Sequence, residues 1–338
     1  MHLYSPPFTL LPAAPAHVPD VDGQPCFGRF AGTTENIDWS RLARPYARSA
    51  FWRRFHHKRW QYIALATEEL FCGIAIVDLG WTNTAFAYAF DRIRRAEVAA
   101  YSRDGLPGLT ARVGRHAGQG SSFTWFGNRI AYRIQDGQRH VLALRCGGFE
   151  IDAEFHAAHA APPLLAVGPI AGGSVHATQK SSGMPLTGEV RAGGRRYGLQ
   201  GGVASLDFSS GLLARETSWQ WASAHSLQLG FNLQSGYFGN HENALWLDGR
   251  LITLGSARFD YDPDDPLAPW RVRTDDGLLD LQFQPEGARR ENKNLLIAAS
   301  RYIQPVGSFS GWVKPAIDAA PRAIARLVGV TEDHFSRW

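Results

Sequence analysis

Short apolar runs of strand length, separated by turns rich in glycine, asparagine and aspartate, recur along almost the whole chain. The runs are about four to eight residues long and rich in aromatic and β-branched side chains, which are typical of β-strands. Three of them, Trp60–Thr67, Phe71–Leu79 and Thr84–Phe90, follow one another closely. This spacing predicts an antiparallel meander, because short connections join antiparallel neighbours.

Aspartate–glycine pairs mark three further hairpins. Both residues of such a pair tolerate the positive φ that a two-residue hairpin turn requires. The predicted strand pairs are Ile130–Ile134 with Val141–Leu144 around Asp136-Gly137, Leu245–Leu247 with Leu251–Leu254 around Asp248-Gly249, and Trp270–Thr274 with Leu278–Phe283 around Asp276-Gly277. The chain is therefore predicted to be a mainly β protein with antiparallel sheets.

Helical patterns are scarce in this sequence. An arginine- and aromatic-rich stretch, Tyr46–His57, predicts one helix. Apolar residues spaced at about 3.6 positions between Ala316 and Val328 predict another near the C-terminus. Strands and helices do not alternate, and no glycine-rich phosphate-binding motif joins a strand to a helix. These observations argue against a doubly wound nucleotide-binding fold.

The length of 338 residues leaves room for about two domains. Prolines and glycines cluster at 160–174, in the segment AAPPLLAVGPIAGGS, and such clusters are typical of a linker. We therefore predict two β-barrel-like domains, residues 1–165 with a proline-rich leading segment and residues 170–338 with the terminal helix. The two halves are similar in size but show no clear internal repeat.

Charge and hydropathy limit the kinds of partner that we expect for the chain. No apolar run reaches the ~18–20 residues that cross a bilayer, and the first 19 residues contain no lysine or arginine. We therefore expect a cytoplasmic protein without a transmembrane segment, and peripheral contact with a membrane stays open. Lysine and arginine total 35 against 31 acidic residues, and the two signs are interspersed, so we expect no nucleic-acid partner. The sequence does not indicate the oligomeric state.

The sequence contains no motif that indicates a metal site or a cofactor. The cysteines, Cys26, Cys72 and Cys146, lie far apart without a CxxC pair, and no HxH or HExxH motif occurs. The patterns SxxK, GxSxG and DxDxDG are also absent, which removes motif support for serine hydrolases and EF-hand calcium sites. We expect no cofactor and no bound metal.

The stretch from Asp207 to Asp248 is the richest in chemically useful side chains. In a strand, Trp219 and Trp221 share one face because side chains alternate between the two faces. Two adjacent indoles form an aromatic wall that suits a hydrophobic ligand or the face of a sugar ring. An equally simple interpretation is that both indoles belong to the packed core of a β-barrel.

Titratable residues lie close to these tryptophans in the sequence, and an apolar pocket would shift their pKa values enough to supply an acid and a base. The alternative is that these carboxylates lie on surface loops, where Asp248 simply begins the Asp-Gly turn. The candidate catalytic residues are Asp248, Glu242, Glu216 and His225, and the candidate ligand-binding residues are Trp219, Trp221, Trp246, Asn243 and Asp207.

Several separate segments resemble, in order, the family catalogued as domain of unknown function 2804. They are HKRWQYIAL, FCGIAIVDLGW, AFAYAFD, LDFSSGLLARETSWQWAS, ENALWLDGR, PWRVRTDDGLLDLQF and GSFSGWV, and the resemblance covers most of residues 20–335. This family is distantly similar to the tandem lipocalin-like proteins that include carotenoid hydratase (hydroxyneurosporene synthase) and fungal Diels–Alderase-type cyclases, whose two β-barrels hold hydrophobic ligands. The resemblance implies two antiparallel lipocalin-like (calycin-like) barrels or curved sheets packed together, with few helices.

The hydratase group also implies a candidate acid. Its His-x-Trp element is followed some two dozen residues later by Tyr-x-Asp, and similar spacing here gives Trp219-x-Trp221 and Trp246-x-Asp248. By this resemblance Asp248 would protonate an alkene while aromatic faces stabilise the developing carbocation. Tryptophan replaces both the histidine and the tyrosine, so two of the four positions depart from the pattern.

We hypothesise that the chain binds a small hydrophobic or amphipathic molecule, such as an isoprenoid or a lipid, in a tryptophan-lined pocket, and transforms it by acid–base chemistry. The pocket would lie in the second barrel or between the barrels. Two alternatives stay open. A non-catalytic lipid or terpenoid carrier needs the aromatic wall but no buried acid. A carbohydrate-processing enzyme needs two inward-facing carboxylates beside an exposed tryptophan. The sequence does not decide whether the protein is an enzyme.

Overall fold

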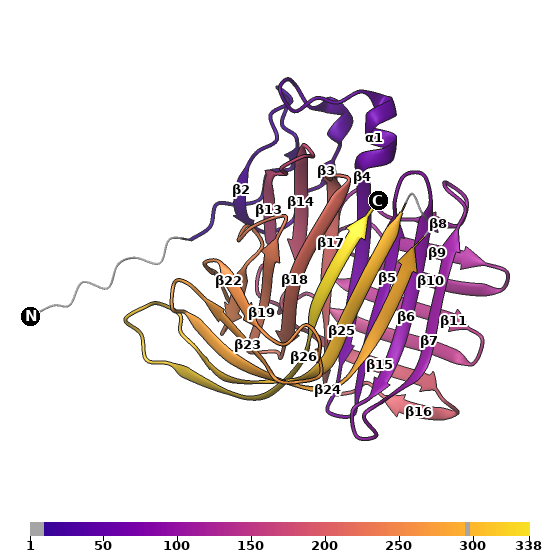
Figure 1. Ribbon diagram of the computed structural model, residues 1–338, viewed down its shortest axis with the longest axis vertical. Coiled ribbons are helices and arrows are strands. Elements are labelled where there is room, and N and C mark those ends of the chain that lie inside the picture. The colour runs from indigo at the N-terminus through magenta and orange to yellow at the C-terminus, as the bar shows by residue number, and fades with distance from the viewer. Residues whose placement is uncertain (1–9, 295–297) are drawn as a thin grey trace, which may run out of the picture.

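The computed structural model describes residues 10–294 and 298–338 of the chain. Strands make up 60% of these described residues and helices 3%, and most strands belong to two large antiparallel sheets (Figure 1). This confirms the predicted fold class of packed, curved β-sheets with few helices. Among the described residues, no helix combines the length and the apolar character needed to cross a membrane.

The first sheet has fifteen strands and forms a nearly closed barrel. Its strand order is β7-β6-β5-β4-β17-β15-β12-β11-β10-β9-β8; β14, β13 and β2 extend in turn from β17, and β16 pairs with β15. The strands are β2 (Gly28–Ala31), β4 (His57–Ala66), β5 (Leu70–Asp78), β6 (Asn83–Asp91), β7 (Ala96–Gly105), β8 (Ala111–Arg112), β9 (Ser121–Trp125), β10 (Asn128–Gln135), β11 (Arg139–Cys146), β12 (Phe149–His156), β13 (Leu164–Pro169), β14 (Val175–Lys180), β15 (Met184–Ala192), β16 (Arg195–Gly198) and β17 (Gly202–Leu212).

The second sheet has nine strands and curves into a half-barrel, in the order β21-β20-β19-β18-β26-β25-β24-β23-β22. Its strands are β18 (Glu216–His225), β19 (Leu229–Gly236), β20 (Ala244–Leu247), β21 (Arg250–Thr253), β22 (Ala257–Asp260), β23 (Trp270–Thr274), β24 (Leu279–Asn294), β25 (Ala299–Val313) and β26 (Arg322–Arg337). The remaining elements are β1 (His17–Val18), β3 (Asn36–Ile37), the 3-10 turn η1 (Trp39–Arg41) and helix α1 (Ala50–His56).

The predicted meander and the three predicted hairpins are confirmed. Strands β4, β5 and β6 pair in sequence, and β10–β11, β20–β21 and β23–β24 pair as expected. At the first turn Asp136 and Gly137 have φ values of 50° and 68°, and at the second Asp248 and Gly249 have 50° and 77°. These positive φ values are the reason why Asp-Gly pairs signal such turns.

The predicted helix near the C-terminus is wrong, because residues 316–321 lie in the connection after β25 and strand β26 begins at Arg322. It pairs with β25 on one side and β18 on the other, so its backbone bonds lie in the sheet. Buried Val328 and Val330 alternate with Gly329, and β-branched side chains favour strands. The predicted helix at Tyr46–His57 does exist but begins four residues later, where the Ser49 hydroxyl accepts a hydrogen bond from the Trp52 amide.

The predicted division into domains at residues 165–170 stays a prediction. The hydrogen-bonded sheets themselves change over between Leu212, the last residue of β17, and Glu216, the first of β18. Each sheet buries its own apolar core. A third apolar cluster joins β4, β5 and β6 of the first sheet to β18, β25 and β26 of the second. The two sheets therefore pack face to face through this layer.

Candidate functional site

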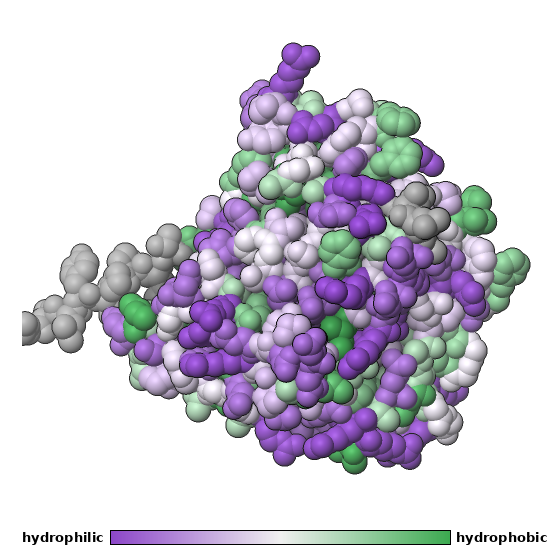
Figure 2. Space-filling view, in the orientation of Figure 1, coloured by the Kyte–Doolittle hydropathy of each residue, from purple (hydrophilic) through white to green (hydrophobic). Residues whose placement is uncertain are grey.

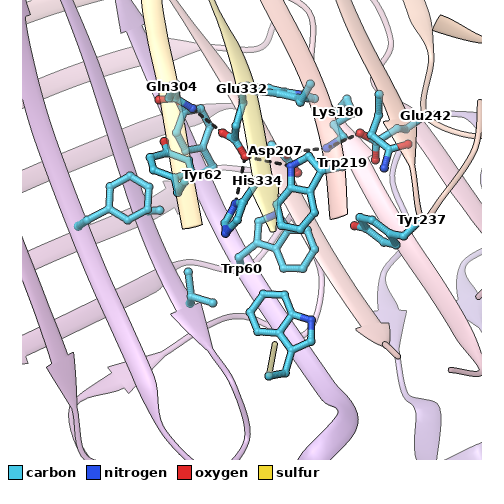
Figure 3. A pocket seen from close by; sticks show the side chains of 17 residues that line it. Trp60, Tyr62, Lys180, Asp207, Trp219, Tyr237, Glu242, Gln304, Glu332 and His334 are labelled. Carbon is cyan, nitrogen blue, oxygen red and sulfur yellow. Dashed lines mark hydrogen bonds and ion pairs between the residues drawn. The ribbon is translucent and has the colours of Figure 1, made fainter. Parts of the chain in front are cut away.

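A pocket of about 120 Å³ opens in the layer between the two sheets (Figure 3). Its walls are mostly aromatic, yet five acidic or basic side chains face it. The aromatic residues include Trp60, Tyr62, Trp219, Trp221, Tyr237 and Trp338, and the acidic or basic residues are Lys180, Asp207, Glu242, Glu332 and His334. Apolar walls with a few convergent polar groups are typical of ligand-binding sites.

One wall of the pocket comes from a row of side chains across the first sheet. Tyr62 on β4 pairs with Asp207 on β17, and Asp207 pairs with Lys180 on β14. Directly paired residues in antiparallel strands point to the same face, so all three side chains project toward the second sheet. The next residue on β4, Ile63, turns instead into the barrel core. Strand register therefore places Lys180 beside Asp207.

The opposite wall contains two such rows from the second sheet. Trp221 on β18 pairs with Glu332 on β26. Trp219 pairs with His334, which in turn pairs with Tyr302 on β25. The two-residue spacing along β18 and β26 keeps both rows on the same face. The alternate residues of β18 turn into the core of the second sheet.

Three charged side chains meet at one end of the pocket. The Nζ atom of Lys180 lies 2.5 Å from Asp207 Oδ2 and 3.3 Å from Glu242 Oε1. The Lys180 side chain is only 4% exposed, and both carboxylates are also largely buried. Removing such charges from water costs several kcal/mol per ion, so they must be paired in the folded protein. We call Lys180, Asp207 and Glu242 the lysine cluster.

The protonation of the lysine cluster follows from its burial. Burial raises the pKa of the Glu242 carboxyl, and the attraction of Lys180 offsets this shift only in part. For Lys180 burial acts to lower the pKa, but the two carboxylates outweigh it and the net shift is upward. Lys180 therefore stays charged, while Glu242 holds a proton at higher pH than an exposed glutamate does.

The loop between β19 and β20 brings Glu242 into the pocket. The indole N–H of Trp221 donates to Asn232 Oδ1 at 2.8 Å, and Asn232 Nδ2 donates to the Glu242 backbone oxygen at 3.0 Å. Asn243 also fixes this loop. Its side-chain oxygen accepts from the Gln234 backbone N–H at 2.7 Å, and its side-chain nitrogen donates to the Gly255 backbone oxygen at 2.8 Å. The aromatic wall and the acid are thus connected by hydrogen bonds.

Glu332 is the centre of a second polar group on the opposite wall. Its Oε1 accepts from the Trp219 indole at 2.9 Å and lies 3.3 Å from His334 Nδ1, and its Oε2 accepts from Gln304 at 2.8 Å. Gln304 in turn accepts from the Tyr88 hydroxyl at 2.5 Å. Both carboxylate oxygens of Glu332 therefore have partners within the wall (Figure 3).

Two lining residues carry unused hydrogen-bonding groups. Within residues 10–294 and 298–338, the side-chain amide of Gln234 and the hydroxyl of Tyr302 are buried without a hydrogen-bond partner. Such groups are rare in folded proteins because each costs ~1–3 kcal/mol. Their position in the pocket gives a polar part of a ligand something to bind. No group of three His, Cys, Asp or Glu side chains that could hold a metal occurs in the described part of the chain.

A second, outer pocket of about 200 Å³ adjoins the first. The two share the lining residues Val77, Phe86, Tyr302, His334 and Trp338. The outer pocket also has a charged side, formed by an ion-pair network of Asp104, Lys293, Glu291 and Arg289. The shared residues make the two pockets one continuous site, with the lysine cluster in the inner part.

The structure brings four of the sequence-predicted residues together at the inner pocket. They are Asp207, Glu242, Trp219 and Trp221. Trp219 and Trp221 lie on the same face of β18, as the alternation of a strand requires. This face is turned toward the first sheet, so the pocket lies between the sheets rather than inside the second one.

The other five predicted residues lie outside this pocket. The Asp248 side chain is 62% exposed and pairs with Arg322, and exposed Glu216 pairs with Arg337. His225 is buried against Trp246, whose indole donates to the Pro162 backbone oxygen at 2.9 Å. Asn243 forms hydrogen bonds that fix the loop between β19 and β20. We therefore leave these five out of the proposed reacting groups.

Sequence reasoning missed Lys180, Glu332 and His334. Lys180 is one of only four lysines in the chain, and it ends a strand whose residues are all buried. Glu332 and His334 follow the helix that the sequence predicted up to Val328, and no strand was predicted there. Their spacing of two, continued by Ser336, would have placed them on one face of a strand.

Comparisons with known proteins bear on the family and the fold. The family described as Domain of unknown function (DUF2804) matches residues 13–338. An AttH-like protein from Nitrosomonas europaea superposes with a TM-score of 0.53 at 14% identity, covering 86% of this chain and 96% of that one. CghA, solved with Sch210972, superposes with a TM-score of 0.54 at 11% identity, covering 83% and 88%. None of the curated proteins matches the sequence. At these identities the similarity shows a common fold.

Proposed function

Because the chain belongs to the DUF2804 family and has the fold of proteins such as CghA, which was solved with a bound compound, we propose that it binds a small hydrophobic or amphipathic molecule between its two sheets and transfers a proton to it. The binding walls are the aromatic faces of the inner and outer pockets. The reacting groups belong to the lysine cluster.

The burial of the lysine cluster is the observation that carries this proposal. Three ionisable groups at the end of an aromatic pocket are costly to the fold, and a simple carrier of apolar molecules has no need of them. Titratable groups with shifted pKa values, gathered in a pocket, are typical of catalytic sites. The cluster therefore favours acid–base chemistry over passive transport.

Glu242 is the proton donor in this proposal. Its raised pKa keeps the carboxyl protonated more readily than that of an exposed glutamate. When the proton moves to a carbon or oxygen atom of the ligand, the carboxylate left behind is stabilised by the ammonium of Lys180, 3.3 Å away. The faces of Trp219 and Trp221 favour positive charge on the ligand. Glu242 regains a proton in one of two ways. Either the protonated ligand loses a proton from another position, or a water molecule adds to it and then loses a proton.

The test begins with the protein purified from its own host, in which native mass spectrometry and extraction identify the small molecule that it retains. That molecule is then incubated in D₂O with the wild type, with E242Q and with E189Q. Glu189 is a matched control because its carboxylate pairs with arginines at the surface of the first sheet. Deuterium incorporated at carbon, or a changed product mass, reports proton transfer.

We expect E242Q to retain the molecule but to transfer protons at least ~100-fold more slowly, and E189Q to match the wild type. The wild-type rate should also fall as the pH rises through the pKa of Glu242, because the acid is then ionised. A wild type that binds the molecule without any exchange would identify a carrier. Full retention by the variant W219A/W221A would place the ligand elsewhere.

A further inference from the structure

Helix α1 turns its phenylalanines away from the protein. None of its residues is buried, and Phe51 and Phe55 are 77% and 44% exposed. The two rings lie one helical turn apart, with centroids 5.2 Å from each other, while Trp52 and His56 stack on another side of the helix. A helix of a globular domain ordinarily turns its apolar stripe toward the core. This stripe needs a different partner.

A second group of exposed apolar side chains lies on the other side of a cationic pocket from helix α1. The loop after β7 exposes Leu106 and Leu109, the latter at 80%. A pocket of about 310 Å³ connects the two, since Arg53 and Arg54 of α1 line it together with Pro107 of this loop. Figure 2 shows apolar surface at the position that α1 has in Figure 1.

The charge of this pocket is positive. Its lining includes three arginines and one carboxylate, Asp78, which pairs with Arg59 at 2.5 Å. In the described part of the chain, Arg53 and Arg54 pair with no carboxylate. Burial lowers the pKa of neighbouring His57 to about 3, so its ring is neutral and leaves the arginines to set the charge.

We propose that this surface docks the protein on an anionic membrane. The docking surface consists of Phe51, Arg53, Arg54, Phe55, Leu106 and Leu109. Exposed aromatic and aliphatic side chains beside arginines that have no carboxylate partner are the composition by which interfacial helices enter the headgroup region, where the arginines bind lipid phosphates. A soluble acidic protein would supply the charge but no apolar layer for the four apolar side chains.

The docking surface adjoins the outer pocket of the ligand site. Asp78 and Gly80 line the cationic pocket, while Leu79 and Trp81 of the same turn line the outer pocket. A hydrophobic molecule leaving the bilayer would therefore reach the aromatic walls without crossing open water. This route rests on the proposed function, whereas the docking itself does not.

The experiment measures co-sedimentation of the full chain with vesicles of phosphatidylcholine and of an equimolar mixture of phosphatidylcholine and phosphatidylglycerol. We expect binding to the anionic vesicles that weakens with salt. The variant R53Q/R54Q should lower the partition coefficient about thirtyfold, and F51S/F55S about tenfold or more. The unfolding midpoint of F51S/F55S should equal that of the wild type, because both rings lie on the surface. That of R53Q/R54Q should fall only slightly, because Arg53 also donates a hydrogen bond to the Arg48 backbone oxygen at 2.6 Å.

Arg94 and Arg95 provide the matched control. They lie beside exposed Ile93 in the turn between β6 and β7, at the opposite end of these strands, and Arg94 pairs with Asp91. The variant R94Q/R95Q should bind vesicles as the wild type does. The proposal would be overturned if the wild type bound both vesicle types equally, or if R94Q/R95Q lost as much vesicle binding as R53Q/R54Q. It would also be overturned if the wild type formed a dimer that F51S/F55S dissociates. Vesicle binding that survives in E242Q while proton transfer is lost separates docking from the proposed function.

Discussion

Lys180 is the residue on which the candidate site most depends. Its ammonium lies between Asp207 and Glu242 in a largely buried position, so it neutralises charge that the surrounding aromatic side chains cannot. The same ammonium would stabilise the Glu242 carboxylate after proton transfer. One side chain therefore serves both the stability of the fold and the proposed chemistry.

Replacing this lysine tests its structural part. We expect K180M to lower the free energy of unfolding at pH 7 by ~3–5 kcal/mol, because it leaves the buried Asp207 carboxylate without its counter-charge. The double variant K180M/D207N should recover part of this loss, since it removes that charge. Urea unfolding of the wild type and both variants makes the measurement. A loss below ~1 kcal/mol for K180M would contradict the account.

At the residue scale, the sequence pointed to four of the residues that line the candidate pocket. Asp207, Glu242, Trp219 and Trp221 stood out because they lie in one dense segment. The partner of Asp207 and Glu242, Lys180, comes from a strand outside that segment, and its place beside Asp207 depends on the register of β14 and β17. Register of distant strands is decided by the packing of the whole sheet, which local spacing does not report.

Strand β26 is the element that holds the site together. It supplies Glu332 and His334 to the pocket and pairs with both β18 and β25. Gly329 of β26 pairs with Ala224 of β18. A Cβ atom at this position would lie 2.3 Å from the backbone oxygen of Ser223, so the strands fit only because glycine has no side chain.

Gly329→Ala should separate the two strands locally. We expect it to lower the free energy of unfolding by ~1–3 kcal/mol, because backbone atoms must move to relieve the overlap. Gly148→Ala is the control, since a Cβ atom there meets nothing within 4 Å. Chemical denaturation of the two variants, compared with the wild type, makes the test. Equal stability of both variants would show that β26 and β18 adapt without cost.

At the element scale, hairpins were predictable and β26 was not. Asp136-Gly137 and Asp248-Gly249 form their turns from local φ preferences alone. In the C-terminal segment the apolar residues also fitted a helical period, and the choice depended on partners far away in sequence. Pairing with β18 and β25 satisfies the hydrogen-bonding groups of the β26 backbone on both sides, and this overrides the local helical pattern.

The whole molecule is a barrel and a half-barrel that enclose the site between them. The pocket takes Tyr62 and Lys180 from one sheet and Trp221 and Glu332 from the other. Any loosening of the contact between the sheets therefore changes the site and the fold together.

Buried histidines should make this molecule less stable in mild acid. Burial lowers the pKa of His140 to about 4 and that of His225 to about 3, both below the ordinary 6.5. Below pH 6.5 the unfolded chain binds protons that the native protein does not. The stability that these two residues contribute is therefore complete above pH 6.5 and is lost as the pH falls toward their native values.

Urea unfolding at pH 7 and pH 5 measures this loss. We expect a fall of about 2 kcal/mol for each of the two histidines. The variant His225→Asn should reduce the difference by about 2 kcal/mol, the share of one such histidine, while replacement of exposed His17 leaves it unchanged. Glu242 acts in the opposite direction, because its raised pKa favours the native state as the pH falls. An unfolding free energy that is the same at both pH values would contradict the prediction.

The sequence by itself determined the class of fold, the hairpins and the aromatic face of β18, because turn preferences and side-chain alternation act over a few residues. Only the tertiary structure decided that this face meets β4 and β17, that Lys180 lies beside Asp207 and Glu242, and that Asp248 lies outside the pocket at the surface. The physical reason is distance along the chain. Burial and charge pairing at the site arise from strands that are far apart in sequence and meet only when both sheets have formed.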